Sequence, residues 1–588
     1  MNNLTKKHFD ILLKLAVAPY RNQRELADDL SYALGLVNAC LKDLIGAGLL
    51  ETNMRLTRAA KELIRERSPK RGIILAAGFG TRMVPINLET PKGLLEVNGE
   101  PLVERLICQL HQVGVSDITI VVGFKKEKFH YLLEKYGVKL VVNSEYANKN
   151  NLYSLYLARH SLENVYIIPS DIWCATNPFQ RQELYSWYMM SQVPIAGSPV
   201  VVNKQEQLAI ISGKKTGHRM VGIAYLTGSH TERLNGLLDQ CVNQEAYEQS
   251  FWEDLLLCDV TKHTPLYAKS IQSKEVIEIN TFEELRELDH VSKNLQIASM
   301  EVISEALGVG LDEIEHIRVL KKGMTNRSFR FTCRGHDYIM RIPGEGTDQL
   351  INRQEEADVY QALDGYGICD PVFYIDPLTG YKISEYFADS RTADASDWKD
   401  VESCIRFLRT FHEQQLTVGH EFDLFKQLEF YESLWSSRHS LYKDYAQTKE
   451  QILSLRPFIE AHVERKVLSH IDAIPDNFLM VKDADGLENL HLIDWEYAGM
   501  QDPHVDIAMF AIYSFYDKEG IDRLIDCYFE QACPNQTRLK IYAYVAICGL
   551  LWSNWCEYKY GLGVDFGDYS LKQYSYAKDF YKLVSEAL

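Results

Sequence analysis

The chain has 588 residues, too many for one hydrophobic core, so we expect two to four domains. A hydrophobic fraction of 46% and a charged fraction of 24% are ordinary for globular domains and exclude a mainly disordered chain. The formal net charge of -18 repels phosphate backbones, so nucleic acid is not expected as the main partner, whereas a cationic small molecule is mildly favoured.

The first segment, residues 1–67, reads as helices separated by short breaks. Residues 23–30 are amphipathic, and Ser31 is predicted to cap a second helix that runs to about Ile45. A glycine-rich stretch ends that helix before an apolar pair. Helix, turn, helix and short wing together resemble a winged helix-turn-helix domain of bacterial regulators.

The helix that would contact DNA in such a domain, residues 32–45, offers Asn38 and Lys42 but no arginine. Asp43 on the same helix would repel the DNA backbone. DNA binding is therefore one interpretation of this segment. The charge pattern favours the other, a docking or dimerisation module, with a homodimer as the assembly that it would build.

A polar stretch with a proline, residues 65–71, marks a linker to the second block, residues 72–290. This block alternates strands with helical patterns, which predicts a mixed, mostly parallel sheet with helices on both faces. The predicted strands are residues 73–76, 117–122, 139–143 and 165–168.

A phosphate-binding loop is predicted directly after the first of these strands, where residues 75–95 read LAAGFGTRMVPINLETPKGLL. Its glycines let backbone N–H groups approach phosphates closely, Arg82 can neutralise triphosphate charge, and Lys92 follows a proline that stiffens the loop. We therefore expect Arg82 and Lys92 to act in catalysis. The predicted nucleotide-binding residues of the loop are Ala77, Gly78, Gly80 and Thr81.

This string resembles the nucleoside-triphosphate transferase signature, and the block is most similar to bacterial phosphocholine cytidylyltransferases. The shared elements are residues 98–99, 117–123, 150–154, 170–172 and 277–280. The resemblance implies a Rossmann-like fold that takes CTP and phosphocholine, and Mg²⁺ as cofactor with Asp171 and Asn280 as ligands. Some members carry Asp at the second position, but the carbonyl oxygen of Asn also suits a hard cation.

In the reaction that this resemblance implies, a phosphomonoester oxygen attacks the α-phosphorus in line and pyrophosphate leaves, so the protein mainly positions groups and stabilises charge. A quaternary ammonium offers no ordinary hydrogen bond, so aromatic faces and nearby carboxylates are expected to recognise it. For any single aromatic candidate, a place in the hydrophobic core is the favoured interpretation over a substrate contact. The candidates for substrate binding are Tyr153, Trp173, Tyr225, Trp252 and Glu253, with Phe251 and Asp254 beside them.

A helical connector, residues 283–307, leads into a third block, residues 300–588, where strands come first and helices follow. Residues 470–477 read HIDAIPDN, and Asp494 follows Asn477 by 17 residues at the end of an apolar strand. This spacing is the kinase arrangement of a base and two metal ligands. It predicts that Asp472 accepts the proton of a substrate hydroxyl, while Asn477 and Asp494 hold magnesium on the phosphates of ATP.

The wider context resembles choline and aminoglycoside kinases, which implies a protein-kinase-like fold. Residues 323–326 would form a turn over the phosphates, with Asn326 at the nucleotide. Residues 338–344 resemble the choline-kinase strand in which Arg replaces the usual Lys. Arg341 would then contact ATP phosphates and pair with Glu355 or Glu356, of which we favour Glu356.

Glu385 and Tyr386 occupy the place where the hinge of this family meets adenine, and residues 493–508 are very similar to bacterial choline kinases. Within that run, Asp506 is expected to support the catalytic loop. The family's choline site uses aromatic side chains, and Trp552 and Trp555 lie on one helical face together with Tyr558. A buried helix would also produce this pattern, but two neighbouring tryptophans favour a cation site.

The twelve cysteines are scattered without a Cys-x-x-Cys pair, so neither a zinc site nor a disulfide framework is indicated. No signal-type stretch opens the chain, and no run of about 18 apolar residues occurs. We expect a soluble, cytoplasmic protein.

The sequence thus predicts a multidomain chain of α/β and α+β class whose two resemblances name consecutive reactions. Choline would be phosphorylated with ATP, and the phosphocholine would be coupled to CTP to give CDP-choline. Two alternatives stay open: the same chemistry on ethanolamine or another amino alcohol, and a transcriptional regulator that senses choline or nucleotides.

Overall fold

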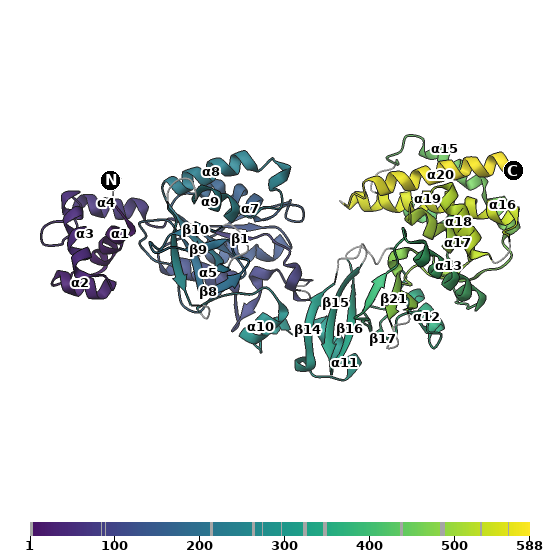
Figure 1. Ribbon diagram of the computed structural model, residues 1–588, viewed down its shortest axis with the longest axis horizontal. Helices are drawn as coiled ribbons and strands as arrows, with labels where there is room; N and C mark the ends of the chain where they lie inside the picture. The colour runs from purple at the N-terminus through teal and green to yellow at the C-terminus, as the bar shows by residue number, and fades with distance from the viewer. Residues whose placement is uncertain are drawn as a thin grey trace. The chain divides into compact units, whose positions relative to one another are not determined.

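The computed structural model describes residues 4–83, 85–88, 90–211, 216–260, 265–272, 275–295, 297–320, 326–344, 350–435, 439–482, 488–529, 532–562 and 564–588, without the side chains of residues 81, 88, 259 and 260. The chain divides into two compact units, Met1–Met300 and Glu301–Leu588 (Figure 1). No helix in the described ranges is long and apolar enough to cross a lipid bilayer. All twelve cysteines are free thiols.

Helices open the first unit. They are α1 (Lys6–Val17), α2 (Gln23–Leu30), α3 (Leu34–Gly46) and α4 (Arg58–Arg67). The prediction for Ser31 was wrong: it ends α2 with a left-handed backbone (φ 56°), and its N–H donates to carbonyl oxygens of α2, so the next helix begins only at Leu34. An isolated antiparallel bridge joins Leu50 to Leu56 after α3.

This helical segment packs on the rest of the first unit through Leu184 and Tyr185. The side chain of Leu184 is fully buried in the core of α1–α4, and the hydroxyl of Tyr185 donates to Asp10 Oδ1 over 2.9 Å. Helix α4 continues to Arg67, whose Nη1 donates to the carbonyl oxygen of Leu184 over 3.2 Å. The predicted linker, residues 65–71, is therefore helical at its start and held to the following domain.

A seven-stranded sheet forms the centre of the first unit, with strand order β12-β8-β11-β6-β1-β4-β5. Its strands are β1 (Arg71–Ala76), β4 (Asp117–Val122), β5 (Lys139–Val142), β6 (Val165–Pro169), β8 (Trp187–Ala196), β11 (Thr216–Leu226) and β12 (Tyr267–Ile271). Strand β1 pairs in parallel with β4 and β6, whereas β11 runs antiparallel to β6 and β8. The predicted mixed, mostly parallel sheet is confirmed.

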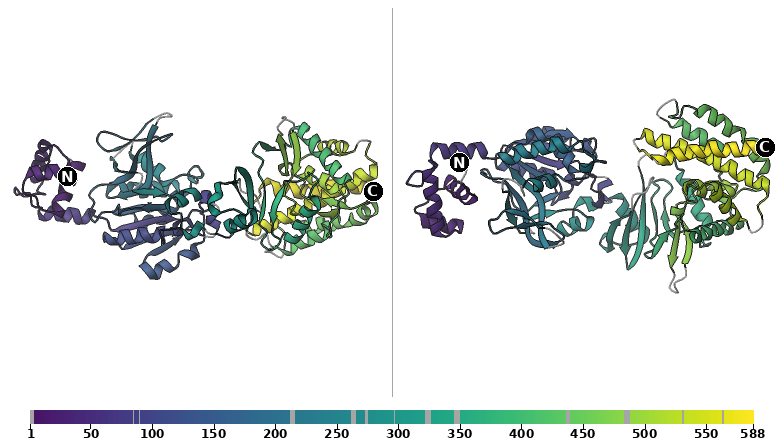
Figure 2. Two further views of the ribbon diagram at one scale, coloured as in Figure 1. Left: turned by 90° about the horizontal axis from the view of Figure 1, so that it is seen from below. Right: turned by 45° about the horizontal axis from the view of Figure 1, so that its top comes forward.

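Helices cover both faces of this sheet. Successive residues of β1 face opposite sides, so its apolar side chains contribute to a core on each face. Ile74 packs in one core with Leu106, and Ile73 packs in another with Leu155. Figure 2 shows the ribbon of this unit in two further views. The covering helices are α5 (Leu102–Gln112), α6 (Tyr131–Tyr136), α7 (Asn151–Leu157), α8 (Ser229–Cys241) and α9 (Trp252–Val260), and α10 (Phe282–Leu288) and α11 (Ala298–Leu307) follow the last strands.

The second unit begins within α11 and continues with a five-stranded antiparallel sheet of order β14-β15-β16-β18-β17. The strands are β14 (Ile314–Val319), β15 (Asn326–Cys333), β16 (His336–Pro343), β17 (Val372–Ile375) and β18 (Lys382–Glu385), with α12 (Arg353–Leu363) between β16 and β17 in the chain. This arrangement of a sheet followed by helices matches the expected kinase-like fold.

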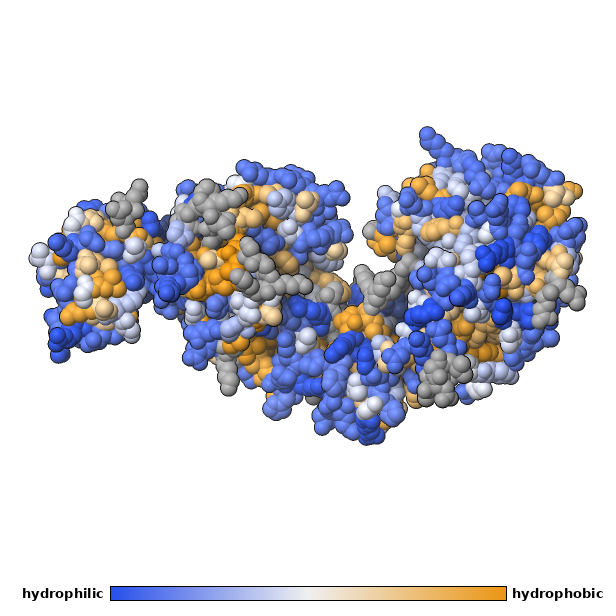
Figure 3. All heavy atoms as spheres, viewed as in Figure 1, coloured by the Kyte–Doolittle hydropathy of each residue, from blue (hydrophilic) through white to orange (hydrophobic). Residues whose placement is uncertain are grey.

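A helical part follows the sheet in the chain. The antiparallel strands β21 (Phe478–Lys482) and β22 (Glu488–Leu492) lie within this part of the sequence. Its helices are α13 (Trp398–Glu413), α14 (Leu424–Ser433), α15 (Tyr445–Ser454), α16 (Arg456–His462), α17 (His504–Tyr513), α18 (Lys518–Tyr528), α19 (Asn535–Gly561) and α20 (Asp568–Ala587). Most of α19 is buried, which explains why its sequence is apolar on nearly every side. On the face shown in Figure 3, polar residues cover much of the helical part and apolar residues form small patches.

Candidate active sites

A pocket of ≈ 380 Å³ lies at the carboxyl ends of the parallel strands β1, β5 and β6 in the first unit. This edge is where open α/β sheets usually bind ligands. The predicted residues that line the pocket are Ala77, Gly78, Gly80, Arg82, Lys92 and Asp171. The side chain of Thr81 lies outside the described residues.

The loop after β1 is shaped by Gly80 and Asn87. Gly80 has φ 66°, a backbone conformation that glycine adopts readily and other residues rarely adopt. The buried side chain of Asn87 donates to the carbonyl oxygens of Phe79 and Gly80 over 3.2 and 3.1 Å. Asn87 was missed because its role depends on folding the loop back by seven residues.

Residues from three distant segments meet beside this pocket. Lys92 Nζ contacts Asp171 Oδ2 and donates to Asn280 Oδ1 over 2.8 Å. Arg82 Nη2 donates to the same oxygen of Asn280 over 2.9 Å. The two predicted metal ligands and the two predicted phosphate-binding cations therefore form one cluster.

The predicted substrate-binding residues of this unit are not gathered at the pocket. Trp173 lies on β7 (Ile172–Cys174), and the Arg105 guanidinium is 5.3 Å from the centroid of its ring. Tyr153 stacks on Tyr156 with ring centroids 6.1 Å apart. Within the described part of the chain, none of the five predicted side chains lines this pocket.

Of the other three predicted side chains, Tyr225 and Trp252 lie in the packed interior and Glu253 is half-buried beside Tyr188. Tyr225 is fully buried and its hydroxyl contacts the carbonyl oxygen of Arg67, and Trp252 is buried in the same core as Leu255. Glu253 accepts a hydrogen bond from the Tyr188 hydroxyl over 3.2 Å, and burial raises its pKa to about 7. These positions favour packing over contact with substrate.

A second pocket, of ≈ 530 Å³, lies between the sheet and the helical part of the second unit. The predicted residues among those that line it are Asn326, Arg341, Asp472, Asn477, Asp494, Trp552 and Trp555. Three tyrosines that sequence reasoning did not select, Tyr497, Tyr513 and Tyr569, line it as well. Tyr497 stands inside the kinase-like run of residues 493–508, which was the one available signal for it.

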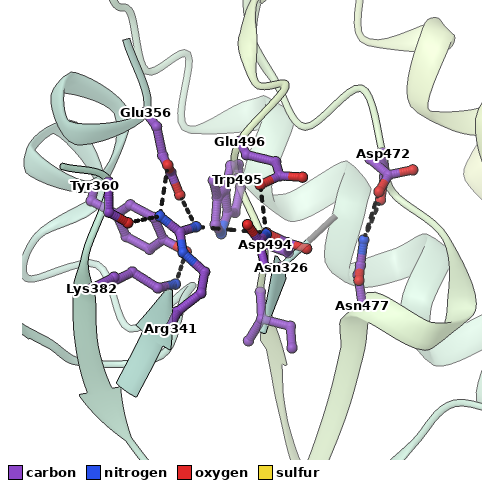
Figure 4. A network of polar contacts seen from close by, with 12 residues as sticks. Asn326, Arg341, Glu356, Tyr360, Lys382, Asp472, Asn477, Asp494, Trp495 and Glu496 are labelled. Carbon is purple, nitrogen blue, oxygen red and sulfur yellow. Dashed lines mark hydrogen bonds and ion pairs between the residues drawn. The ribbon is translucent and has the colours of Figure 1, made fainter. Parts of the chain in front are cut away.

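The loop that carries Asp472 is held from both sides. Asn477 Nδ2 donates to the backbone oxygen of Asp472 over 2.9 Å and to its Oδ2 over 3.1 Å (Figure 4). Asp506 accepts hydrogen bonds from the backbone N–H groups of His470 and Ile471 over 2.9 and 2.7 Å. Asp506 thus supports the loop as expected.

His412, which sequence reasoning missed, joins Asp506 to a more distant helix. Its Nε2 lies 3.0 Å from Asp506 Oδ2 and its Nδ1 lies 2.8 Å from the hydroxyl of Tyr528. Nothing in the local sequence marks this residue, because 94 positions separate it from Asp506.

Carboxylates concentrate negative charge in this second pocket. Burial, followed by the charges of Asp494 and Glu496, raises the pKa of Asp472 well above its ordinary value. Burial and Glu496 likewise raise the pKa of Asp494 to about 7. Burial lowers the pKa of His470 to about 4, so this imidazole is neutral near pH 7. Besides burial, repulsion between these carboxylates contributes to both raised pKa values, and a bound cation would relieve that repulsion.

Arg341 on β16 pairs with Glu356 on α12, the partner that we favoured over Glu355. Arg341 Nη2 donates to Glu356 Oε2 over 2.9 Å and to the carbonyl oxygen of Gly380 over 3.2 Å. Asn326 donates to Glu496 Oε2 over 2.8 Å, whereas residues 323–325 of the predicted turn lie outside the described residues.

At the predicted hinge, the N–H of Glu385 donates to Pro371 O and that of Tyr386 donates to Asp337 O, each over 3.0 Å. Trp552 and Trp555 are 5% and 3% exposed, and their ring centroids lie 5.6 Å apart in an edge-to-face arrangement. Both side chains pack in the hydrophobic core and also line the pocket.

Comparison with known proteins agrees with the division of the chain into two units. A choline/ethanolamine kinase family model matches residues 317–542, and a MobA-like NTP transferase model matches residues 72–217. A choline-phosphate cytidylyltransferase of Streptococcus pneumoniae is 34% identical over 227 residues, covering 38% of this chain and 99% of the relative. Protein LicA of Haemophilus influenzae is 29% identical over 282 residues, covering 45% of this chain and 99% of the relative. The crystal structure of choline kinase LicA from Streptococcus pneumoniae aligns with a TM-score of 0.43 at 28% identity, over 48% of this chain and 98% of that one.

Proposed function

The chain belongs to the choline-phosphate cytidylyltransferases through its first unit and carries a choline/ethanolamine kinase domain in its second, and we propose on this premise that it makes CDP-choline from choline in two steps. The kinase unit forms phosphocholine from choline and ATP, and the transferase unit couples phosphocholine to CTP with release of pyrophosphate. The observation that carries this proposal is that one chain holds two pockets, one lined by Arg82, Lys92 and Asp171 and the other by Asp472, Asn477 and Asp494.

For phosphoryl transfer, Asp472 accepts the proton of the choline hydroxyl as the oxygen attacks the γ-phosphorus of ATP and the bond to ADP breaks. The hydrogen bond from Asn477 Nδ2 fixes the orientation of the Asp472 carboxylate. Arg341, held by Glu356, offers positive charge to the phosphates.

For cytidylyl transfer, an oxygen of phosphocholine attacks the α-phosphorus of CTP, and the bond to pyrophosphate breaks. Backbone N–H groups of the Gly78–Gly80 turn approach the phosphates, and Arg82 and Lys92 stabilise the negative charge that develops on them. No side chain needs to form a covalent intermediate in this reaction.

Both sites fit Mg²⁺ by the chemistry of their donor atoms. Asp171 with Asn280, and Asp494 with Asn477, each offer a carboxylate and an amide oxygen, which are hard ligands. Among the residues that the structure describes, no group of three or more His, Cys, Asp or Glu side chains is gathered to hold a metal. Mg²⁺ is usually bound by one or two carboxylates together with substrate phosphates, and when bound it neutralises phosphate charge.

The aromatic lining of the second pocket favours choline over ethanolamine as the amine. Trp552, Trp555, Tyr497, Tyr513 and Tyr569 all line it. Aromatic faces attract a quaternary ammonium, whereas a primary ammonium is better held by hydrogen-bond acceptors.

A single assay tests the function. Purified full-length protein is incubated with choline, ATP, CTP and Mg²⁺, and phosphocholine, CDP-choline and pyrophosphate are measured, with ethanolamine in a parallel reaction. We expect CDP-choline only when both nucleotides are present. Failure of both half-reactions would refute the proposal.

A further inference from the structure

Arg353 stands at the first position of α12 with its side chain turned inward. Only 7% of that side chain is exposed. Its Nη1 donates to Glu356 Oε2 over 3.0 Å and to Glu496 Oε2 over 3.3 Å, and its Nη2 donates to Asn326 Oδ1 over 3.4 Å. One guanidinium therefore joins α12, the strand β15 and the segment that follows Asp494.

These contacts form a series of alternating charges that begins at Asp494 and ends at Glu496. Asp494 Oδ1 lies 3.9 Å from Arg341 Nη1, and Arg341 is bound by Glu356 (Figure 4). Arg353 links Glu356 to Glu496, which follows Asp494 by two residues. Displacing any member moves the two groups on either side of it, because their side chains share the same donors and acceptors.

We propose that Arg353 is a positioning residue for phosphoryl transfer, which fixes the Arg341–Glu356 pair relative to Asp494 through its bridge to Glu496. The inference rests on the proposed kinase activity of this unit. Arg353 does not line the pocket among its described residues, so it acts through Glu356 and Glu496 and not on substrate.

The surroundings are built for an arginine at this position. Gly380 has φ 70°, and a Cβ there would lie 2.9 Å from Arg353 Nε, so a larger residue would collide with the guanidinium. The side chains of Glu356 and Glu496 are 0% and 2% exposed, and buried carboxylates are costly without charged partners. The planar guanidinium reaches three acceptors in fixed directions, which the single ammonium of lysine cannot reproduce.

The test compares Arg353→Gln, Arg353→Lys, Glu496→Gln and the double variant Arg353→Gln/Glu496→Gln with the wild type. In each full-length protein, kcat and KM for choline and for ATP are measured in the kinase reaction. Choline binding is measured by calorimetry, which reports whether the second unit remains folded. Arg334→Gln is the matched control, since Arg334 forms an exposed ion pair of 2.9 Å with Glu313 in the same sheet region.

We expect Arg353→Gln to lower kcat by about tenfold or more while KM for choline stays within about twofold, because misplaced reacting groups slow the chemical step more than they weaken binding of the amine. Arg353→Lys should recover part of that loss. The double variant should be no slower than the slower single variant, since both changes break the same bridge.

Three results would overturn the inference: kcat of Arg353→Gln within about twofold of wild type, losses that multiply in the double variant, or an equal loss of choline binding. A wild-type protein that forms no phosphocholine would instead refute the proposed function itself. Arg334→Gln should match the wild type, and a comparable loss in that control would also count against a special role for Arg353.

Discussion

Lys92 Nζ and Asn280 Oδ1 are joined by a hydrogen bond of 2.8 Å across 188 residues of sequence. The loop after β1 and the end of the transferase domain therefore meet at one point, where a cation and a potential metal ligand share a bond.

The first prediction concerns Asn280 in this cluster. Asn280→Leu removes the oxygen, so CDP-choline formation should fall by about a hundredfold, within the range for lost electrostatic stabilisation. Asn280→Asp keeps the oxygen and adds charge, and should lower the Mg²⁺ concentration needed for half-maximal rate. The measurement is the rate of pyrophosphate release against Mg²⁺ concentration. Equal Mg²⁺ dependence in all three proteins would remove Asn280 from the metal site.

The second prediction separates the two activities. Asp472→Asn should lower phosphocholine formation from choline by about a thousandfold, because a general base of this kind contributes 10² to 10⁴ in rate. The same protein should convert supplied phosphocholine and CTP into CDP-choline at the wild-type rate. Asp526→Asn, at an exposed position on α18, serves as the control. A kinase rate that survives in Asp472→Asn would assign the base elsewhere.

The third prediction addresses recognition of the ammonium group. Trp555→Ala should raise KM for choline by tenfold or more, since a desolvated cation–π contact contributes on the order of 2 kcal/mol. KM for ATP should stay nearly constant. Tyr560→Ala removes a 53% exposed ring from the same helix and provides the comparison. If both variants behave alike, Trp555 has a packing role only.

The fourth prediction follows from Glu253, whose pKa rises from its ordinary 4.5 to about 7 because it is buried. The unfolded chain releases this proton near pH 4.5 and the folded chain keeps it to about pH 7, so this group's contribution to stability is lost as pH rises between these values. The loss amounts to roughly 3 kcal/mol at about 1.4 kcal/mol per pKa unit.

Glu253→Gln removes the titration and should abolish that fall. Hydrogen exchange of α9 peptides, corrected for intrinsic rates, reports the local opening free energy at pH 5 and pH 7. The variant should gain protection relative to wild type at the higher pH. A constant difference between the two proteins would mean that Glu253 is ionised in the folded chain.

Much of the sheet in the first unit was predictable, because short apolar strands are bounded by loops that carry chemistry. The prediction for residues 117–122 coincides with β4, and that for 73–76 falls within β1. Ser31 was misjudged because a serine at a helix boundary can end one helix as well as begin the next, and only the backbone angle decides.

The spacing of Asp472 and Asn477 within one loop correctly predicted that they lie together, since a tight turn of five residues leaves the backbone little freedom. His412 and Arg353 were missed because they act across 94 and 143 residues. Contacts over such separations leave no periodic or motif signal in a single sequence. The aromatic candidates of the first unit failed to gather for a related reason: aromatic side chains fill cores as readily as they bind cations.

Leu184 has a consequence for any attempt to divide the chain. It lies between Asp171 and Asn280 in sequence, yet its side chain is fully buried among α1–α4. A shortened protein that begins near residue 70 would expose this leucine and the ring of Tyr185 to water as an apolar patch. Such a fragment would tend to self-associate during purification. Keeping the first helices, or replacing Leu184 by a polar residue, should yield a better-behaved transferase fragment.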